Sequence, residues 1–313
     1  MDPRGFPTTL PEFQNVFPNE DACAKYLETM RWPDGFVCPR CQNRKAWRVT
    51  KNLWQCAQCD YKASVTAGTI FQDTRKPLTL WFRVIWYVTS QKNGASALGL
   101  QRVLGLGSYE TAWTWLHKLR RAMVRPGRDR LSGRVEVDET YWGGPEPIRG
   151  RGAAAKALIA VAAQEDGLGI GRIRLCGIAD ASAVSLGGFV QDVVEPGSVV
   201  HTDGWSGYAG LEAVGYRHEV TNLEQSNGTA SELLPRVHRV VSLLKRWLMG
   251  THQGAVSHGH LDYYLDEYTF RFNRRRARHR GLLFYRLLQQ AVQIDPVPYR
   301  KLVVSGKTKD RHI

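Results

Sequence analysis

The stretch Arg134-Val135-Glu136-Val137-Asp138-Glu139-Thr140-Tyr141-Trp142-Gly143-Gly144 predicts the fold of the larger part of this chain. The β-branched residues before Asp138 predict a strand that ends in a carboxylate and then opens into small and aromatic residues. Val199-Val200-His201-Thr202 before Asp203 repeats the pattern. The chain therefore has two predicted strands that each end in an aspartate.

Aspartates at the ends of different strands can converge on a divalent cation, which is how two-metal phosphoryl-transfer sites are built. Each aspartate alone also has a plainer interpretation, because Asp is a common turn and helix N-cap residue. The pair, in a strongly basic chain, favours the metal site. Glu136 and Glu139 flank Asp138, and strand alternation is expected to place both on the opposite face of the sheet from it.

The charge of the chain indicates a polyanionic partner. The 313 residues include 43 Lys and Arg against 29 Asp and Glu, a net charge of +14 at pH 7. Residues 1–130 hold 20 of the basic and 10 of the acidic residues, so most of the excess lies there. A charge of this size and distribution favours nucleic acid over a membrane surface.

The sequence has no apolar run of about 18 residues and no signal peptide at its start. We therefore expect no membrane partner and a cytoplasmic, nucleoid-associated protein in a bacterium. Paired thiols in that compartment hold a metal more often than they form disulfides.

Four cysteines form two C-x2-C pairs, Cys38 with Cys41 and Cys56 with Cys59, with 14 residues between the pairs. This is the spacing of a zinc ribbon, in which four thiolates hold one tetrahedral ion. Residues 46–49 and 53–55 are expected to pair as a small sheet between them. A redox pair and two disulfides are the alternatives, and both are unfavourable in a reducing compartment. Four thiolates leave no open position, so the zinc is expected to be structural.

Residues 96–104 and 108–123 are predicted to form two helices joined by a turn at 105–107, which matches a helix-turn-helix in size. The second helix would bury a stripe of Ala112, Trp115, Leu116 and Leu119. Its outer face, which could lie in a major groove, would carry Tyr109, Glu110, Thr114, His117, Lys118, Arg120 and Arg121. An ordinary pair of helices explains the pattern almost as well.

A third metal ligand is expected in the helical region 231–292. His238 lies 35 residues after Asp203, and Lys245 lies seven residues further on, so the two share one helix face. A metal ligand followed by a cation suits a phosphodiester, because one residue holds the ion and the other a phosphate. A neutral imidazole can ligate Mn²⁺ but is a poorer partner for Mg²⁺. Glu267 is the rival third ligand, or else a structural partner of nearby arginines such as Arg271.

These features resemble the insertion-sequence DDE transposases that carry an N-terminal zinc ribbon, over about residues 31–275. The resemblance rests on the two cysteine pairs and on four stretches: Val137-Asp138-Glu139-Thr140-Tyr141-Trp142-Gly143-Gly144, His201-Thr202-Asp203-Gly204-Trp205, Leu244-Lys245-Arg246-Trp247-Leu248-Met249-Gly250-Thr251-His252, and Tyr264-Leu265-Asp266-Glu267-Tyr268-Thr269-Phe270-Arg271-Phe272-Asn273-Arg274-Arg275. An ordinary DDE site has a glutamate where this chain has His238, and a Lys or Arg where it has Lys245.

The resemblance implies an α/β protein with an RNase H-like catalytic domain, a mixed sheet with flanking helices, preceded by a small β zinc ribbon and a helical helix-turn-helix-like region. It implies Asp138 and Asp203 as ligands of Mg²⁺ or Mn²⁺, with His238 and Lys245 completing the catalytic set. The expected parts are a helical lead-in (1–30), the zinc ribbon (31–70), the helix-turn-helix-like region (71–125), a linker (126–133), the catalytic domain (134–292) and a basic C-terminal tail (293–313).

The implied activity is a transposase that cleaves DNA phosphodiesters and transfers the strand by two-metal phosphoryl transfer. Its partners would be double-stranded DNA, at the element ends and at the target, and another copy of the chain, because synapsis of two ends needs at least a dimer. One alternative is an RNase H-like nuclease or resolvase without strand transfer. Another is a catalytically inactive zinc-ribbon DNA-binding protein derived from a transposase.

Overall fold

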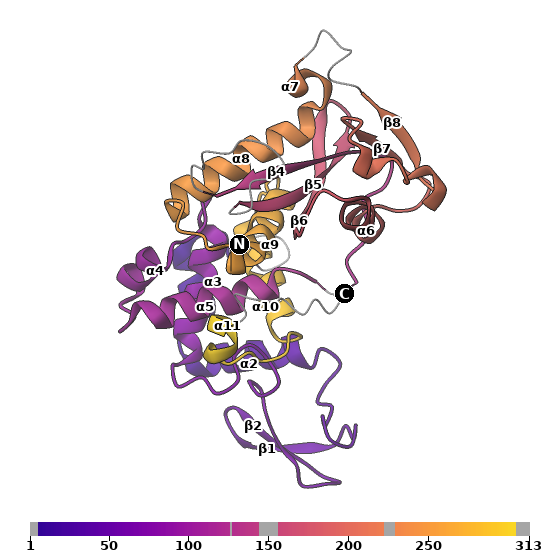
Figure 1. Ribbon diagram of the computed structural model, residues 1–313. Helices are drawn as coiled ribbons and strands as arrows, with labels where there is room; N and C mark the ends of the chain where they lie inside the picture. Colours follow the sequence, from indigo (N-terminus) through magenta and orange to yellow (C-terminus); the bar gives the residue numbers. More distant parts are fainter. Residues whose placement is uncertain (1–5, 126, 144–155, 222–228, 305–313) are drawn as a thin grey trace. The chain divides into compact units, whose positions relative to one another are not determined.

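The computed structural model describes residues 6–125, 127–143, 156–221 and 229–304 (Figure 1). Within these residues the chain forms two compact units. Met1–Arg125 and Arg276–Val304 make up the first unit, and Pro126–Arg275 makes up the second. The chain therefore leaves the first unit once and later returns to it.

The ribbon of the first unit is a small antiparallel sheet around the cysteines. Its strands, in the order β1-β2-β3, are β1 (Ala46–Thr50), β2 (Leu53–Cys56) and β3 (Lys62–Ser64). Its core consists of Phe36, Cys38, Cys56 and Ala63, and the ring of Trp54 stacks on Phe36 at 5.9 Å. Because its core has so few apolar side chains, the ribbon depends on its cysteines for a large part of its stability.

Helices make up the rest of the first unit: α1 (Leu10–Val16), α2 (Glu20–Arg31), α3 (Leu78–Ser90), α4 (Ala97–Leu104), α5 (Tyr109–Ala122), α10 (Arg280–Ala291) and α11 (Tyr299–Val304). A cluster of phenylalanine rings joins helices that are far apart in the sequence. The ring of Phe284 on α10 lies 5.4 Å from Phe13 on α1 and 5.6 Å from Phe82 on α3.

This cluster corrects the predicted end of the catalytic domain. The sequence analysis assigned residues up to 292 to that domain, whereas residues 276–304 group with the first unit. The physical reason is the apolar face of α10, whose Phe284, Leu287 and Leu288 are buried in that unit. The predicted tail 293–313 also contains α11, with Leu302 fully buried, and its residues 305–313 lie outside the described part of the chain.

The predicted pair of helices is present as α4 and α5. The hydroxyls of Ser96 and Ser108 cap them by accepting the backbone N–H of Gly99 (3.0 Å) and Thr111 (3.1 Å). Gly105 ends α4 with φ 61°, a left-handed conformation that glycine adopts without strain.

The predicted outer face of α5 is wrong at two positions. The expected stripe is buried, but His117 and Arg120 are also buried, at 0% and 2% exposure. A single-stripe pattern assumes packing on one side only. Helix α5 is covered on more than one side, because Tyr299 of α11 meets Trp113 at 6.3 Å and Lys118 donates to the carbonyl of Ile70 at 3.4 Å.

The second unit contains the mixed sheet that the sequence predicts. Its order is β6-β5-β4-β7-β8, from the strands β4 (Arg134–Trp142), β5 (Ala157–Asp166), β6 (Gly169–Ile178), β7 (Val199–Thr202) and β8 (Arg217–Val220). Strands β4, β5 and β6 are antiparallel neighbours, whereas β7 pairs in parallel with both β4 and β8. Strands β4 and β7 lie where the sequence predicts strands, whereas β8 was not predicted.

Helices cover both faces of this sheet (Figure 1). On one face, α6 (Ala183–Val193) packs Phe189 and Val190 against Val137 of β4. The other face carries α8 (Pro235–His252) and α9 (Leu261–Asn273), after the short α7 (Ala230–Leu233). Short 3-10 turns occur at Ser206–Tyr208, Glu212–Val214 and His258–His260.

Helix α8 is held on the sheet by side chains spaced three and four residues apart. Val237, Val240, Leu244 and Leu248 are all fully buried in one cluster with β5 and α9. Each such side chain contributes roughly 1.5–3 kcal/mol by leaving water. This stripe fixes the rotation of α8 about its axis, and with it the directions of His238 and Lys245.

The predicted linker 126–133 is only partly a linker. Leu131 is fully buried, its N–H donates to the carbonyl of Val193 (2.7 Å), and its carbonyl accepts from Glu195 (2.7 Å). The end of the linker is therefore built into the second unit, while residue 126 lies outside the description. None of the described helices is long and apolar enough to cross a membrane.

Candidate functional site

The four cysteines of the ribbon form a metal-binding cluster. Their Sγ atoms all lie within 4.8 Å of one another, with 3.7 Å between Cys38 and Cys59 and 3.5 Å between Cys41 and Cys56. Among the residues that the structure describes, this is the one group of three or more His, Cys, Asp or Glu with that spacing. Four thiolates in such a cluster are the ligand set of a structural zinc ion.

The backbone around the cysteines is shaped for this role. Each pair closes a turn, with the N–H of Gln42 donating to Cys38 O (2.9 Å) and that of Asp60 donating to Cys56 O (3.2 Å). Gln42 and Asp60 both have positive φ, 62° and 54°, directly after the second cysteine of a pair. Burial raises the pKa of Cys56, but hydrogen bonds, chiefly from backbone N–H groups such as that of Gln58, outweigh it and lower this pKa to about 6. That favours the thiolate form that a metal requires.

We expect one zinc ion per chain, and Cys56→Ser is expected to lose it together with the ribbon fold. The physical reason is that zinc binding contributes about 10–16 kcal/mol in small zinc domains, far more than the few apolar residues of this ribbon. Elemental analysis of the purified protein, with circular dichroism, checks both expectations. Cys176→Ser is the control, because Cys176 lies in the second unit and donates to Gly177 O (3.0 Å), a bond that serine can keep. A zinc-free wild-type protein would contradict the assignment.

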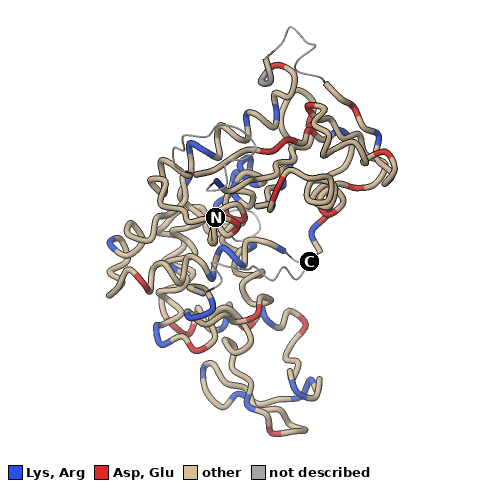
Figure 2. The backbone as a smooth tube through the Cα atoms, in the orientation of Figure 1, with Lys and Arg blue, Asp and Glu red and all other residues tan. Residues whose placement is uncertain are grey.

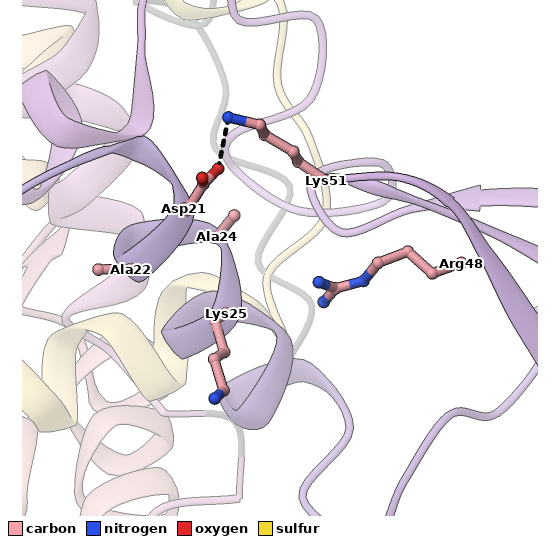
Figure 3. Close-up of a pocket in the computed structure, with 6 residues that line it drawn as sticks. All are labelled: Asp21, Ala22, Ala24, Lys25, Arg48 and Lys51. Carbon is pink, nitrogen blue, oxygen red and sulfur yellow. Dashed lines mark ion pairs between the residues drawn. The ribbon is translucent and has the colours of Figure 1, made fainter.

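A surface pocket of about 360 Å³ lies between α2 and the ribbon (Figure 3). Asp21, Ala22, Ala24 and Lys25 line it from α2, and Arg48 and Lys51 line it from the ribbon side. Lys51 pairs with Asp21 at 2.7 Å, and Arg48 pairs with Glu28. None of the predicted catalytic residues lines this pocket, so it is separate from the candidate site on the sheet.

The two aspartates belong to neighbouring parallel strands, but the prediction that each ends its strand holds only for Asp203, because β7 ends at Thr202 whereas β4 continues past Asp138 to Trp142. Strand β4 pairs with β7 so that Arg134, Val135 and Glu136 lie opposite Val199, Val200 and His201. Extending this register by two residues places Asp203 opposite Asp138. The pairing itself ends at Glu136 and His201, and Asp203 lies just beyond β7, so the register directs the two aspartates toward neighbouring positions without pairing them.

Helix α8 brings the third candidate to the same place. Nε2 of His238 lies 3.7 Å from Oδ2 of Asp138, whose side chain is only 13% exposed. Burial lowers the pKa of His238, with the carboxylates of Glu136 and Asp203 opposing the shift. The neutral imidazole, the form that can ligate a metal, is therefore favoured.

The structure does not draw all three side chains into one tight cluster. The ligand atoms of Asp138, Asp203 and His238 do not all lie within 4.8 Å of one another. One reason is the turn after β7, in which Oδ1 of Asp203 accepts the backbone N–H of Trp205 at 3.0 Å. The chain bends at once after this residue, because Gly204 has φ 83° and any Cβ there would lie 2.7 Å from Val220.

Glu136 and Glu139 flank Asp138, and the prediction that both lie on the opposite face of the sheet from it is wrong for Glu136. Glu136 lies on the same face as Asp138, because residues two apart in a strand point the same way. Its carboxylate is 2% exposed and pairs with Arg236 of α8 at 2.8 Å. The period of two along a strand already places Glu136 on the face of Asp138, so the signal for Glu136 was present in the sequence.

Glu139 accepts a hydrogen bond from a buried tyrosine. Tyr208 is fully buried, and its hydroxyl donates to Oε2 of Glu139 at 2.9 Å. Burial raises the pKa of Tyr208 well above its usual value, and the carboxylates of Glu139, Asp138 and Asp203 add to the effect. Tyr208 therefore stays protonated beside these carboxylates. Sequence analysis missed it, because it belongs to a short turn with no catalytic pattern.

Lys245 lies on the same side of α8 as His238, about 10 Å further along the helix. Desolvation lowers its pKa, Asp138 opposes this, and the positive charge of Lys156 at the start of β5 lowers it further. Asp138 and two lysines are therefore close enough to influence one another. Helix α8 as a whole is basic, as Figure 2 shows. It carries Arg236, Arg239, Lys245 and Arg246 and no acidic residue.

The rival ligand Glu267 is placed differently. It lies on α9, is 0% exposed, and pairs with Arg271 one turn later at 2.7 and 2.8 Å. This is the structural role that the sequence analysis left open for it.

Two protein families match the two units of this chain. Residues 18–62 match the transposase zinc-ribbon domain, and residues 130–273 match the ISXO2-like transposase domain. Together with the four-cysteine cluster and the α/β fold of the second unit, these matches define a transposase.

A relative from an insertion element supports the same class. The chain is 28% identical over 280 residues to the "Uncharacterized protein in transposable element ISH50" of Halobacterium salinarum, across 82% of this chain and 92% of that protein. This chain belongs to the insertion-sequence transposases that join a zinc ribbon to an ISXO2-like transposase domain.

Proposed function

We propose that this protein catalyses transposition of an insertion sequence, by metal-dependent cleavage of DNA at the element ends and transfer of the freed strands to a target. The observation that carries the proposal is the approach of His238 to Asp138, at 3.7 Å, beside the register position of Asp203 within a transposase domain.

We also propose that the second unit is an RNase H-like domain. Three antiparallel strands followed by two strands parallel to the first support this assignment. So does the position of Asp138 within β4 and of Asp203 directly after the parallel strand β7, with the third candidate on a helix that packs on the face of Asp138.

The donor set fits a divalent cation such as Mn²⁺ or Mg²⁺. Two ligands of one ion with bonds of about 2.1 Å are roughly 3–4 Å apart, which matches the spacing of Asp138 and His238. A rotation of the Asp203 side chain out of its turn would complete the set. The mixture of oxygen and nitrogen donors favours Mn²⁺ relative to an all-carboxylate site.

The remaining residues of the site would hold the substrate. The bound ions would polarise the phosphodiester and lower the pKa of the attacking water. Lys245 and Lys156 supply positive charge for the phosphates on either side of the cleaved bond. Strand alternation places Glu139 on the opposite face from Asp138, where the hydroxyl of Tyr208 donates a hydrogen bond to it.

Double-stranded DNA is the proposed partner of both units, and joining two element ends would require at least two copies of the chain. The excess of basic residues in the first 130 residues supports DNA contacts there. The burial of His117 and Arg120, together with the bond of Lys118 to Ile70, leaves Arg121 as the cation of α5 for such contacts.

An assay of cleavage and joining tests the proposed function. The full-length protein, incubated with DNA that carries the element ends and with a target plasmid, is expected to nick the ends and join them to the plasmid, better in Mn²⁺ than in Mg²⁺. Cleavage without joined product would favour the nuclease or resolvase. DNA binding that is independent of metal, with neither product, would favour an inactive DNA-binding protein.

A further inference from the structure

Helix α8, which carries His238, begins without a cap of its own. Its N-cap position is Leu234, whose side chain makes no capping hydrogen bond, and Pro235 occupies the first turn. The first N–H groups of a helix have no partner inside the helix and need an acceptor from elsewhere.

Strand β4 supplies that acceptor. Oε2 of Glu136 accepts the backbone N–H of Arg236 at 2.7 Å and that of Val237 at 2.9 Å. These are the second and third residues of the helix, which an ordinary N-cap side chain would satisfy. The negative charge also lies at the positive end of the helix dipole. A buried glutamate on the sheet therefore caps the helix.

The side chain of Arg236 makes a second set of contacts between the start of α8 and the sheet. Its guanidinium binds Oε1 of Glu136 at 2.8 Å and Oε1 of Glu165 on β5 at 2.9 Å. It also donates to the carbonyls of Gly167 (3.0 Å) and Gly169 (3.2 Å) at the turn between β5 and β6. The start of α8 is thus tied to three strands of the sheet.

These contacts lie directly beside the candidate ligands. Glu136 is two residues before Asp138 on the same strand face, and Val237 immediately precedes His238. The distance between β4 and the first turn of α8 therefore sets the distance between Asp138 and His238. Buried partners of this kind commonly orient the ligands of metal sites.

We propose that Glu136 is a positioning residue of the metal site: its carboxylate caps α8 and, with Arg236, holds His238 at ligand distance from Asp138. The inference rests on the proposed function, since it assumes that Asp138 and His238 share a divalent ion. It adds a residue that touches neither the ion nor the DNA.

Binding of Mn²⁺ to the zinc-loaded, full-length protein tests the inference, with free Mn²⁺ measured by electron paramagnetic resonance. Glu136→Gln keeps the size of the side chain but removes the charge, and places an amide beside the guanidinium of Arg236. It is expected to weaken Mn²⁺ binding by about 10- to 100-fold. Arg236→Lys keeps the positive charge and the capped N–H groups but loses the forked contacts, and is expected to weaken binding less.

Glu219→Gln is the matched control. Glu219 lies on β8 of the same sheet and pairs with Arg134, which is linked to α8 only indirectly, through its second partner Glu165. It is expected to bind Mn²⁺ like the wild type. A melting curve of each variant separates a general loss of stability from a loss of metal binding.

The outcomes distinguish failure of the proposed metal site from failure of the proposed positioning role of Glu136. If Asp138→Asn binds Mn²⁺ as tightly as the wild type, the metal site itself is wrong and the inference falls with it. If Asp138→Asn loses binding while both Glu136→Gln and Arg236→Lys stay within twofold of the wild type, only the positioning role is overturned. Should Glu136→Gln fail to fold, Arg236→Lys decides alone.

Discussion

Asp138→Asn is expected to lower both DNA cleavage and strand joining by at least about a thousandfold. The carboxylate would hold the metal ion, and a bound ion contributes several kcal/mol to the transition state, where each 1.4 kcal/mol is about tenfold in rate. Asparagine keeps the size of the side chain and can still accept the backbone N–H of Glu139, as Asp138 does at 2.8 Å. Asp203→Asn is expected to have the same effect. Gel assays of nicked and joined DNA measure both steps.

DNA binding should survive these two changes, because neither aspartate is expected to position the duplex. A mobility-shift titration is expected to give dissociation constants within about twofold of the wild type. Asp192→Asn, an exposed residue of α6 in the same unit, serves as the control for the loss of one negative charge and should leave all activities unchanged. Strand joining by Asp138→Asn at the wild-type rate would refute the proposed transposase mechanism.

The second large effect on catalytic activity is expected for substitutions of His238. One of them is also expected to change the metal preference of the protein. His238→Ala is expected to lose activity by about a hundredfold or more in either metal, because the shell of ligands is then incomplete. His238→Glu restores a hard oxygen ligand, and is expected to retain activity and to shift its preference from Mn²⁺ toward Mg²⁺. Initial rates in a concentration series of each metal measure the shift.

Glu267 provides the contrasting case, because the structure pairs it with Arg271 inside the second unit. Glu267→Ala leaves a buried arginine without this partner and is expected to cost about 3–5 kcal/mol of stability. The metal preference of the folded fraction should be unchanged. If Glu267→Ala instead abolished catalysis at full stability while His238→Ala remained active, Glu267 would be the third ligand.

The sheet of the second unit could be predicted where its strands are apolar, and not where they are exposed. Strand β7 lies at the predicted residues, since Val200 and its neighbours are buried. Strand β8 was missed because most of it is exposed at the edge of the sheet, so Arg-His-Glu-Val has no alternating pattern. Asp203 does mark the end of β7, which stops at Thr202, whereas the predicted strand end at Asp138 is wrong, because β4 continues to Trp142.

Other features of the site and fold depended on packing that a sequence does not display. The apolar stripe of α10 predicts a buried helix but does not tell which unit buries it. In the structure Phe284 packs against Phe13, so α10 belongs to the first unit. His117 and Arg120 look like outward residues until a further helix covers α5. Glu136 is different, because strand alternation alone places it beside Asp138, and only its role as a helix cap required the structure.

The return of the chain to its first unit has a consequence for the order in which the protein is made. The ribosome completes residues 1–125 first, but Phe284 and the rest of α10 follow only after the whole of residues 126–275. At elongation rates of about 5–20 residues per second this delay is on the order of ten seconds, longer than most small domains need to fold. During that interval the phenylalanines of α1 and α3 lack their partner, whereas the last strand of the second unit's sheet, β8, is made well before α10. The nascent chain can therefore finish its sheet before it finishes the unit that bears the zinc ribbon.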